Sequence, residues 1–173
     1  WCRRASMLLG DPDESATDDE ADDDSLDMLL MAAELVHRRF RSFGEGEFAG
    51  WMREQFEHLK PDDPSVIEAV AALRTSLVTT NYDDLIEKVT GLQSITWQDR
   101  REVMRDLRRD DRRVLHLHGL WNRPETVVLG LESYLAVTQD GHAQTVMKTL
   151  GTATSLLFVG CGEEGLADPN WGR

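Results

Sequence analysis

Cysteine is scarce in this chain of 173 residues, which contains only Cys2 and Cys161. The two are far apart and form no C-x-x-C pair, so the sequence has neither a disulfide framework nor the ligands of a tetrathiolate zinc site. It also has no apolar run near the roughly 20 residues that span a bilayer, and its first residues lack the layout of a secretory signal. These absences predict a cytoplasmic protein without a metal and without membrane contact.

Positive charge is also in deficit, because 19 Lys and Arg stand against 32 Asp and Glu, for a formal net charge of -13. A surface that neutralises phosphate backbones needs Lys and Arg in excess, so direct nucleic-acid binding is not expected. The Arg-rich stretch "DRREVMRDLRRDDRR" (99–113) is interspersed with Asp and Glu. This spacing predicts a solvated helix face with ion pairs between successive turns.

Much of the negative charge lies in "DPDESATDDEADDD" (11–24), a self-repelling run with too few apolar side chains to pack. We therefore divide the chain into a flexible acidic segment (1–24) and one α/β domain (25–173). The chain begins at Trp1 instead of Met. We expect it to be a piece of a longer protein whose domain is incomplete at its N-terminus, and the sequence leaves open whether the domain is also incomplete at its C-terminus.

The first half of the chain has apolar residues at helical spacing. This pattern predicts a helix over 25–41, with Ser25 as its N-cap. A second apolar helix face is predicted over 48–59. A third helix is predicted within 61–74, where Asp63 provides a cap and Pro64 lies in the first turn.

From residue 76 onward the pattern changes to short apolar strands that alternate with helices. Strands are predicted over 76–80, 94–97, 113–118, 126–130 and 155–160. Helices are predicted over 83–89, 99–109, 131–137 and 143–150. This alternation is typical of a Rossmann-like α/β fold, in which a mainly parallel sheet is covered by helices on both faces. Such sheets bind ligands outside the carboxyl ends of their strands.

Polar residues at three predicted strand ends are therefore the candidates for a site. Asn81 can cap the helix that starts near Asp83, or it can contact a ligand, and the sequence leaves both alternatives open. His118 is a candidate general base because the following glycine lets the backbone turn and a ligand approach, whereas His116 is expected to be a core histidine. The "VGCG" stretch (159–162) suits either a close ribose or phosphate contact or a tight turn.

Four stretches taken in order resemble the sirtuin-like family, and within it the zinc-less branch found in bacterial antiphage defence and related NAD-consuming proteins. They are "SLVTTNYDDLIE" (76–87), "VLHLHG" (114–119), "ETVVLGLESYLAV" (125–137) and "LLFVGCGEEGLADPN" (156–170). The resemblance implies a Rossmann-like domain that binds NAD and cleaves its nicotinamide–ribose bond, without a metal. It runs from about residue 26 to the end of the chain.

At matching motif positions, the resemblance implies that Asn81 orders water or the ribose and that His118 is the catalytic base. Asp83 would bind the nicotinamide carboxamide, beside the backbone of Tyr82. Gly160, Cys161 and Gly162 would line the adenosine-side ribose and the phosphates. Asp168 would be the acidic turn residue that follows this segment. The chemistry is coherent, because nicotinamide leaves from an oxocarbenium-like centre that needs an aligned polar group, a base and restricted water.

The chain departs from the family's pattern in several places. Residues 1–25 contain no Gly-Ala-Gly dinucleotide loop, the Gly160–Gly162 stretch lacks a usual hydroxyl residue, and Gly130 stands where a Thr is usual. Paired C-x-x-C motifs of the zinc-bearing deacylases are absent too. The leading hypothesis is NAD hydrolysis by the effector domain of a larger defence or signalling protein, with other domains or further copies as partners. The alternatives are an NAD- or ADP-ribose-binding or scaffold module without turnover, and an NAD-dependent deacylase.

Overall fold

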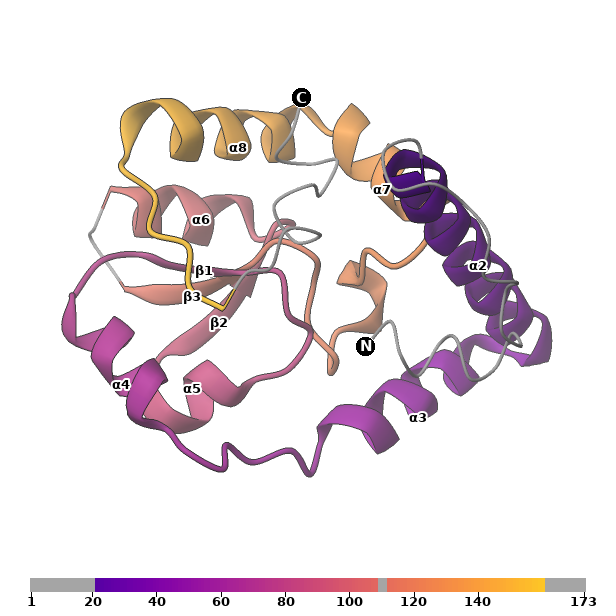
Figure 1. Ribbon diagram of the computed structural model, residues 1–173, viewed down its shortest axis with the longest axis horizontal. Helices are drawn as coiled ribbons and strands as arrows, with labels where there is room; N and C mark the ends of the chain where they lie inside the picture. The colour runs from indigo at the N-terminus through magenta and orange to yellow at the C-terminus, as the bar shows by residue number, and fades with distance from the viewer. Residues whose placement is uncertain (1–20, 109–111, 161–173) are drawn as a thin grey trace.

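A three-stranded parallel sheet forms the centre of the fold in the computed structural model, which describes residues 21–108 and 112–160 (Figure 1). The strands are β1 (Leu77–Thr79), β2 (Gln93–Thr96) and β3 (Arg113–His116). Their order is β1-β3-β2, so β3 is central, and both Thr79 and Thr96 pair with His116. Because the strands are parallel, their carboxyl ends meet at one edge of the sheet. The predicted α/β fold with a parallel sheet is confirmed.

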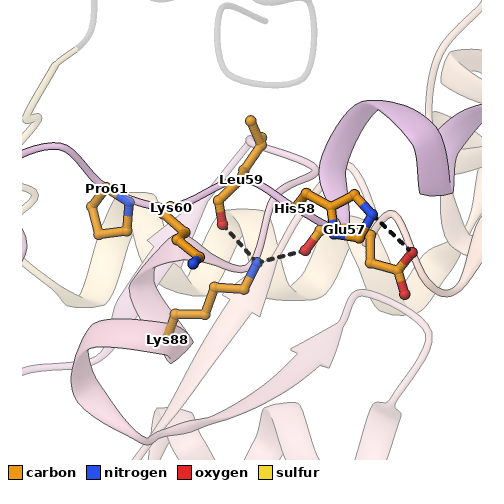
Figure 2. A pocket seen from close by; sticks show the side chains of 6 residues that line it. All are labelled: Glu57, His58, Leu59, Lys60, Pro61 and Lys88. Carbon is orange, nitrogen blue, oxygen red and sulfur yellow. Dashed lines mark hydrogen bonds and ion pairs between the residues drawn. The ribbon is translucent and has the colours of Figure 1, made fainter.

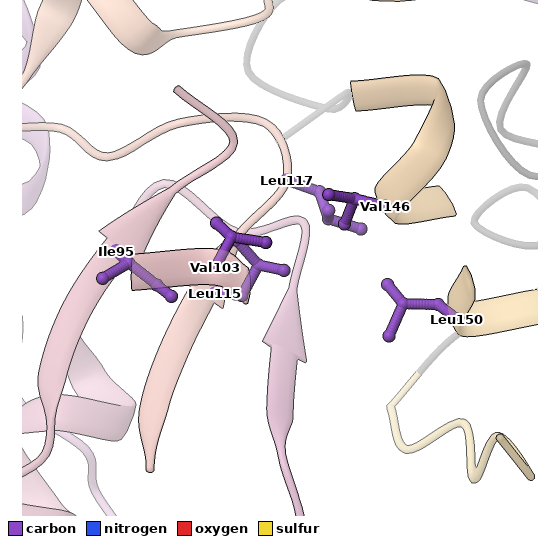
Figure 3. Packing of buried hydrophobic residues seen from close by; sticks show 6 residues of the cluster. All are labelled: Ile95, Val103, Leu115, Leu117, Val146 and Leu150. Carbon is purple, nitrogen blue, oxygen red and sulfur yellow. The ribbon is translucent and has the colours of Figure 1, made fainter. Parts of the chain in front are cut away.

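Helices cover the sheet on two sides, as Figure 1 shows. One side carries α6 (Arg100–Leu107) and α8 (Gly141–Ala153), and the other carries α4 (Ser65–Ala72) and α5 (Leu85–Thr90). Figure 3 shows the core between the sheet and the first pair, formed by Ile95, Val103, Leu115, Leu117, Val146 and Leu150. Each such side chain contributes roughly 1.5–3 kcal/mol when fully buried. Alternation along β3 turns Leu115 into this core and His116 toward α5.

The N-terminal part is helical, as predicted. It consists of α2 (Ala21–Phe43) and α3 (Glu45–Phe56), which pack against each other and extend toward α7 (Leu131–Gln139). A second core cluster joins α3 to the segment after β3 and contains Phe48, Met52, Phe56, Val127 and Leu129. Aromatic rings reinforce the α2–α3 contact, since the ring centroids of Phe40 and Trp51 are 5.3 Å apart.

A close approach between α2 and the start of α7 depends on Gly130. A Cβ atom at this position would lie 2.7 Å from the Cα of Glu34 in α2 and 2.6 Å from its Oε2. The same oxygen accepts a hydrogen bond from the backbone N–H of Glu132 at 3.1 Å, so a carboxylate from α2 caps α7. The absence of a side chain at Gly130, where the resemblance leads one to expect Thr, is therefore required by the way α2 packs in this chain.

Two predicted strands are wrong. Residues 124–126 form the short 3-10 helix η1 (Pro124–Thr126), and residues 127–130 are extended without strand pairing. The backbone N–H groups of Leu129 and Gly130 donate to the hydroxyl of Ser133 instead of to a neighbouring strand. The expected buried strand over 155–160 does not form, because these residues have no regular secondary structure. The four large apolar side chains of this segment are exposed, namely Leu156, Leu157, Phe158 and Val159.

The predicted helix starts differ from the structure by a few residues. α2 begins at Ala21, so Ser25 lies inside the helix and is not its N-cap. The N-cap residue of α4 is Pro64 and not Asp63, although Asp63 Oδ1 accepts a hydrogen bond from the N–H of Ser65 at 2.9 Å. Pro64 is the residue before α4 and does not belong to its first turn. Among the described residues, no helix is both long enough and apolar enough to cross a bilayer.

Candidate functional site

The loop after β1 presents Asn81 to solvent. Its backbone N–H donates to Thr79 Oγ1 at 3.1 Å, while its exposed side chain makes no hydrogen bond to any residue of the described ranges. Of the two alternatives for Asn81, the structure does not show the helix cap, because the N-cap residue of α5 is Asp84. Asp83 holds this helix start, with its Oδ1 accepting from the N–H of Leu85 at 3.1 Å. The Asn81 amide is therefore available to a ligand.

Tyr82 fastens this loop to the polypeptide after β3. Its hydroxyl donates to the carbonyl oxygen of Val128 at 2.6 Å, and its own carbonyl oxygen accepts from the N–H of Trp121 at 2.9 Å. The ring also packs edge-on against Phe56 of α3, with centroids 6.1 Å apart. Tyr82 thus has a structural role in addition to the backbone contact that the resemblance implies for it.

His118 lies in the turn that follows β3, and 6% of its surface is exposed. Its ring packs edge-on against Tyr134 of α7, with centroids 5.4 Å apart. The next residue, Gly119, has φ +85°, and a Cβ atom there would lie 2.3 Å from the carbonyl oxygen of Thr126. The predicted turn at this glycine is confirmed, and the close approach of segment 126–130 fixes where His118 lies.

The sheet register brings the two candidate catalytic residues to neighbouring positions. Thr79 of β1 pairs with His116 of β3, and Asn81 and His118 each follow their paired residue by two positions. Val128 joins both loops, because its carbonyl oxygen accepts from the Tyr82 hydroxyl and its N–H donates to the carbonyl oxygen of His118 at 2.9 Å. Asn81, Tyr82, Asp83 and His118 are therefore gathered at the carboxyl edge of the sheet.

His116 is a fully buried histidine, as predicted. Its Nε2 lies 2.7 Å from Glu87 Oε1 in α5, and its Nδ1 lies 3.0 Å from the carbonyl oxygen of Asn81. Glu87 and Ser94 were not among the residues predicted from the sequence. The Ser94 hydroxyl donates to the same Glu87 oxygen at 2.6 Å. A signal for Glu87 exists in the sequence. A buried histidine needs hydrogen-bond partners, and the helix after the Asn81 loop contains a glutamate that can supply one.

A charged pair stands at the carboxyl end of β2. Asp99 Oδ2 accepts from the N–H of Thr96 at 2.7 Å, and Asp99 Oδ1 accepts from the guanidinium of Arg123 at 3.1 Å. Burial opposes the charged carboxylate, but the hydrogen bonds from Arg123 and Thr96 outweigh it and hold the pKa of Asp99 below its ordinary value. The pair anchors the polypeptide after β3 to β2, next to the candidate site.

The remaining predicted contacts lie at or beyond the end of the described residues. Gly160 is exposed and has φ +70° at the end of segment 155–160. Cys161, Gly162 and Asp168 lie outside the described residues. Their proposed contacts with the adenosine-side ribose and phosphates stay predictions.

Two surface hollows of the described residues lie away from these residues. The first has a volume of about 620 Å³ and is drawn in Figure 2, with Glu57, His58, Leu59, Lys60, Pro61 and Lys88 around it. The ammonium group of Lys88 in this hollow already has partners, because Nζ donates to the carbonyl oxygens of Glu57 and Leu59 and pairs with Asp84. The second, of about 470 Å³, is lined by Arg100, Arg101, Met104, Arg105, Arg108 and His142. Residues 21–108 and 112–160 contain no cluster of three or more metal-ligating side chains.

A family model described as a SIR2-like domain matches residues 75–171, more than half of the chain. The matched range begins just before β1 and includes all three strands. It also includes every candidate residue from Asn81 to Asp168, whereas α2, α3 and α4 precede it.

Proposed function

Since the chain belongs to the SIR2-like domain family, we propose that it binds NAD as its substrate and hydrolyses it to nicotinamide and ADP-ribose. Membership of the family implies NAD-related activity. The observation that supports hydrolysis at this site is the register of β1 and β3, which places Asn81 and His118 two residues beyond a paired position. A free amide and an imidazole thereby follow adjacent strands at the ligand-binding edge of a parallel sheet.

The reaction breaks the bond between the ribose C1′ and the nicotinamide nitrogen. The electron pair of that bond goes to the nitrogen and neutralises the pyridinium, which leaves an oxocarbenium-like cation at C1′. Water then adds to C1′ and gives up one proton. We assign the orientation of water or ribose to the Asn81 amide and the acceptance of the proton to His118, since imidazole is the usual general base near neutral pH.

Asp83 is assigned to the nicotinamide carboxamide, beside the Tyr82 backbone. One carboxylate oxygen of Asp83 already accepts from Leu85, and a carboxylate has room for further donors. Around His118, burial against Tyr134 limits the contact between the base and bulk water.

The test measures nicotinamide and ADP-ribose released from NAD by the full chain. We expect Asn81→Ala and His118→Ala each to reduce kcat by about 100-fold or more. His58→Ala is the matched control, because this histidine is exposed and lies in the surface hollow of Figure 2. Turnover by both site variants at the wild-type rate would show that the proposal is wrong.

One observation favours a second function, the binding of NAD or ADP-ribose without turnover. The candidate base is almost fully buried, with 6% of His118 exposed, and the two hollows described above lie elsewhere. Calorimetry distinguishes the two functions, because ADP-ribose binding by a chain that releases no nicotinamide identifies a binding module. For either function, we propose that the domain serves as the effector of a larger defence or signalling protein, which is the role that the resemblance implies.

A further inference from the structure

We infer that His116 and Glu87 form a buried pair that shares one proton and holds the backbone of Asn81 in place, which makes both of them positioning residues of the proposed site. The inference about ligand orientation rests on the proposed function. The inference about the pair itself rests only on contacts within the chain.

The hydrogen bonds fix where the proton must be. Nδ1 of His116 lies 3.0 Å from the carbonyl oxygen of Asn81, and a carbonyl can only accept, so Nδ1 carries a hydrogen and donates it. Nε2 lies 2.7 Å from Glu87 Oε1. An ionised carboxylate also only accepts, so a second hydrogen lies between the imidazole and Glu87, either as imidazolium with carboxylate or as imidazole with carboxylic acid.

Because both side chains are buried, each needs the other as a hydrogen-bond partner. His116 has no exposed surface, and the Glu87 side chain is 11% exposed. Ser94 donates a second hydrogen bond to Glu87 Oε1 at 2.6 Å, whereas Glu87 Oε2 is buried without a hydrogen-bond partner among the described residues. Removal of either partner would leave the other with an unsatisfied buried polar group, which is unfavourable.

The pair acts on Asn81 through its backbone alone. The carbonyl oxygen of Asn81 is held by His116, and its N–H donates to Thr79 Oγ1 at 3.1 Å. The Asn81 backbone is thereby held by Thr79 of β1 and by His116 of β3, which is itself bonded to Glu87 of α5. These bonds fix where the exposed Asn81 side chain leaves the loop. His116 is fully buried, so it orients the site without touching a ligand.

Two substitutions at Glu87 separate positioning from mere packing. In Glu87→Gln the side-chain amide can donate to Nε2, so a neutral His116 keeps its Nδ1–H bond to Asn81. In Glu87→Leu, Nε2 loses its partner and the ring is free to change tautomer. We expect Glu87→Leu to reduce kcat by roughly tenfold with little change in KM, because misplacement of a catalytic group costs rate. We expect Glu87→Gln to restore kcat to within about threefold of wild type.

The first experiment is independent of NAD. Nitrogen-15 NMR of the full chain should show a protonated Nδ1 in His116, and Glu87→Leu should shift the backbone amide signals of residues 81 and 82. Glu87→Gln should leave those signals close to wild type, as should Glu54→Leu, the matched control at an exposed glutamate of α3.

A wild-type spectrum with an unprotonated Nδ1 overturns the inference, even if Glu87→Leu does not fold. Equal effects of Glu87→Gln and Glu87→Leu on the Asn81 amide overturn it as well. If the wild-type chain leaves NAD intact while its spectrum shows the protonated Nδ1 and the predicted shifts, the proposed function fails and the positioning pair stands.

Discussion

At the scale of single residues, the turn after β3 depends on one glycine. Gly119 has a left-handed backbone, and a side chain there would meet the backbone of Thr126. We expect Gly119→Ala to lower the free energy of unfolding by about 1–3 kcal/mol, since strain at such a position is of this order. Urea denaturation of the variant and of the wild type measures the difference.

The matched control is Gly50→Ala in the interior of α3, where a Cβ atom would have no neighbour within 4 Å. Alanine is the better helix former, so this substitution should stabilise the chain by up to about 1 kcal/mol. Equal effects of the two substitutions would refute the role assigned to Gly119.

The sequence indicated where the candidate residues lie in the fold better than it indicated their local contacts. The sequence allowed Asn81 as a helix cap. Asp84 is the N-cap instead, because three more residues follow Asn81 before α5 begins. His116 was expected to be buried, and it is. Its partner Glu87 stands 29 positions earlier, and a pairing at that separation depends on how α5 crosses β3.

At the scale of elements, α8 depends on a side-chain cap. Asp140 Oδ1 accepts from the N–H of Ala143 at 2.8 Å. This hydrogen bond, against partial burial and with help from Arg100, holds the pKa of Asp140 below its ordinary value. We expect Asp140→Ala to destabilise the chain by about 1 kcal/mol at pH 7, as is typical for loss of an N-cap.

The pH dependence of this effect has a definite sign. A carboxyl whose pKa is lower in the folded state contributes stability above the pKa of the unfolded chain, about 3.9, and loses it as the pH falls through the folded pKa. The difference between Asp140→Ala and wild type should therefore be full at pH 7 and shrink toward pH 2 in chemical denaturation. Asp62→Ala, at an exposed aspartate, provides the control. A gap that stays constant over this range would contradict the assignment.

Helices were predicted more accurately than strands, and the reason lies in hydrogen bonding. A helix satisfies its own backbone, so apolar spacing alone indicated α2, α3, α7 and α8. A strand needs a neighbour, which spacing cannot reveal. The stretch 126–130 has strand-like composition. Its N–H groups nevertheless donate to the Ser133 hydroxyl and to the carbonyl oxygen of His118 instead of to a neighbouring strand. The strand order β1-β3-β2 was likewise inaccessible from a pattern of short apolar runs.

At the scale of the whole molecule, one histidine in the helical N-terminal part makes the stability of the fold depend on pH. His37 in α2 packs against Phe48 of α3, with ring centroids 4.8 Å apart. Burial, together with nearby Arg41, lowers the pKa of His37. The unfolded chain therefore binds a proton more readily than the folded one, so stability should fall as the pH drops from 7 through the unfolded pKa of about 6.5.

His37→Gln cannot take up that proton, so we expect the variant to lose less stability between pH 7 and pH 5 than the wild type. Thermal or urea unfolding at the two pH values measures both losses. His58→Gln is the control, because the His58 side chain is 87% exposed. Identical pH dependence in the wild type and His37→Gln would rule out a contribution from this histidine.

The exposed apolar segment 155–160 also bears on how copies of this chain behave together. Leu156, Leu157, Phe158 and Val159 are all at least 41% exposed, and within the described residues β1 has a strand neighbour on one side only. Exposed apolar side chains and an open strand edge favour aggregation through β-pairing. The net charge of -13 opposes that encounter, because like-charged molecules repel. Salt screens this repulsion beyond about 8 Å at 0.15 M, so the colloidal stability of the protein is governed by ionic strength.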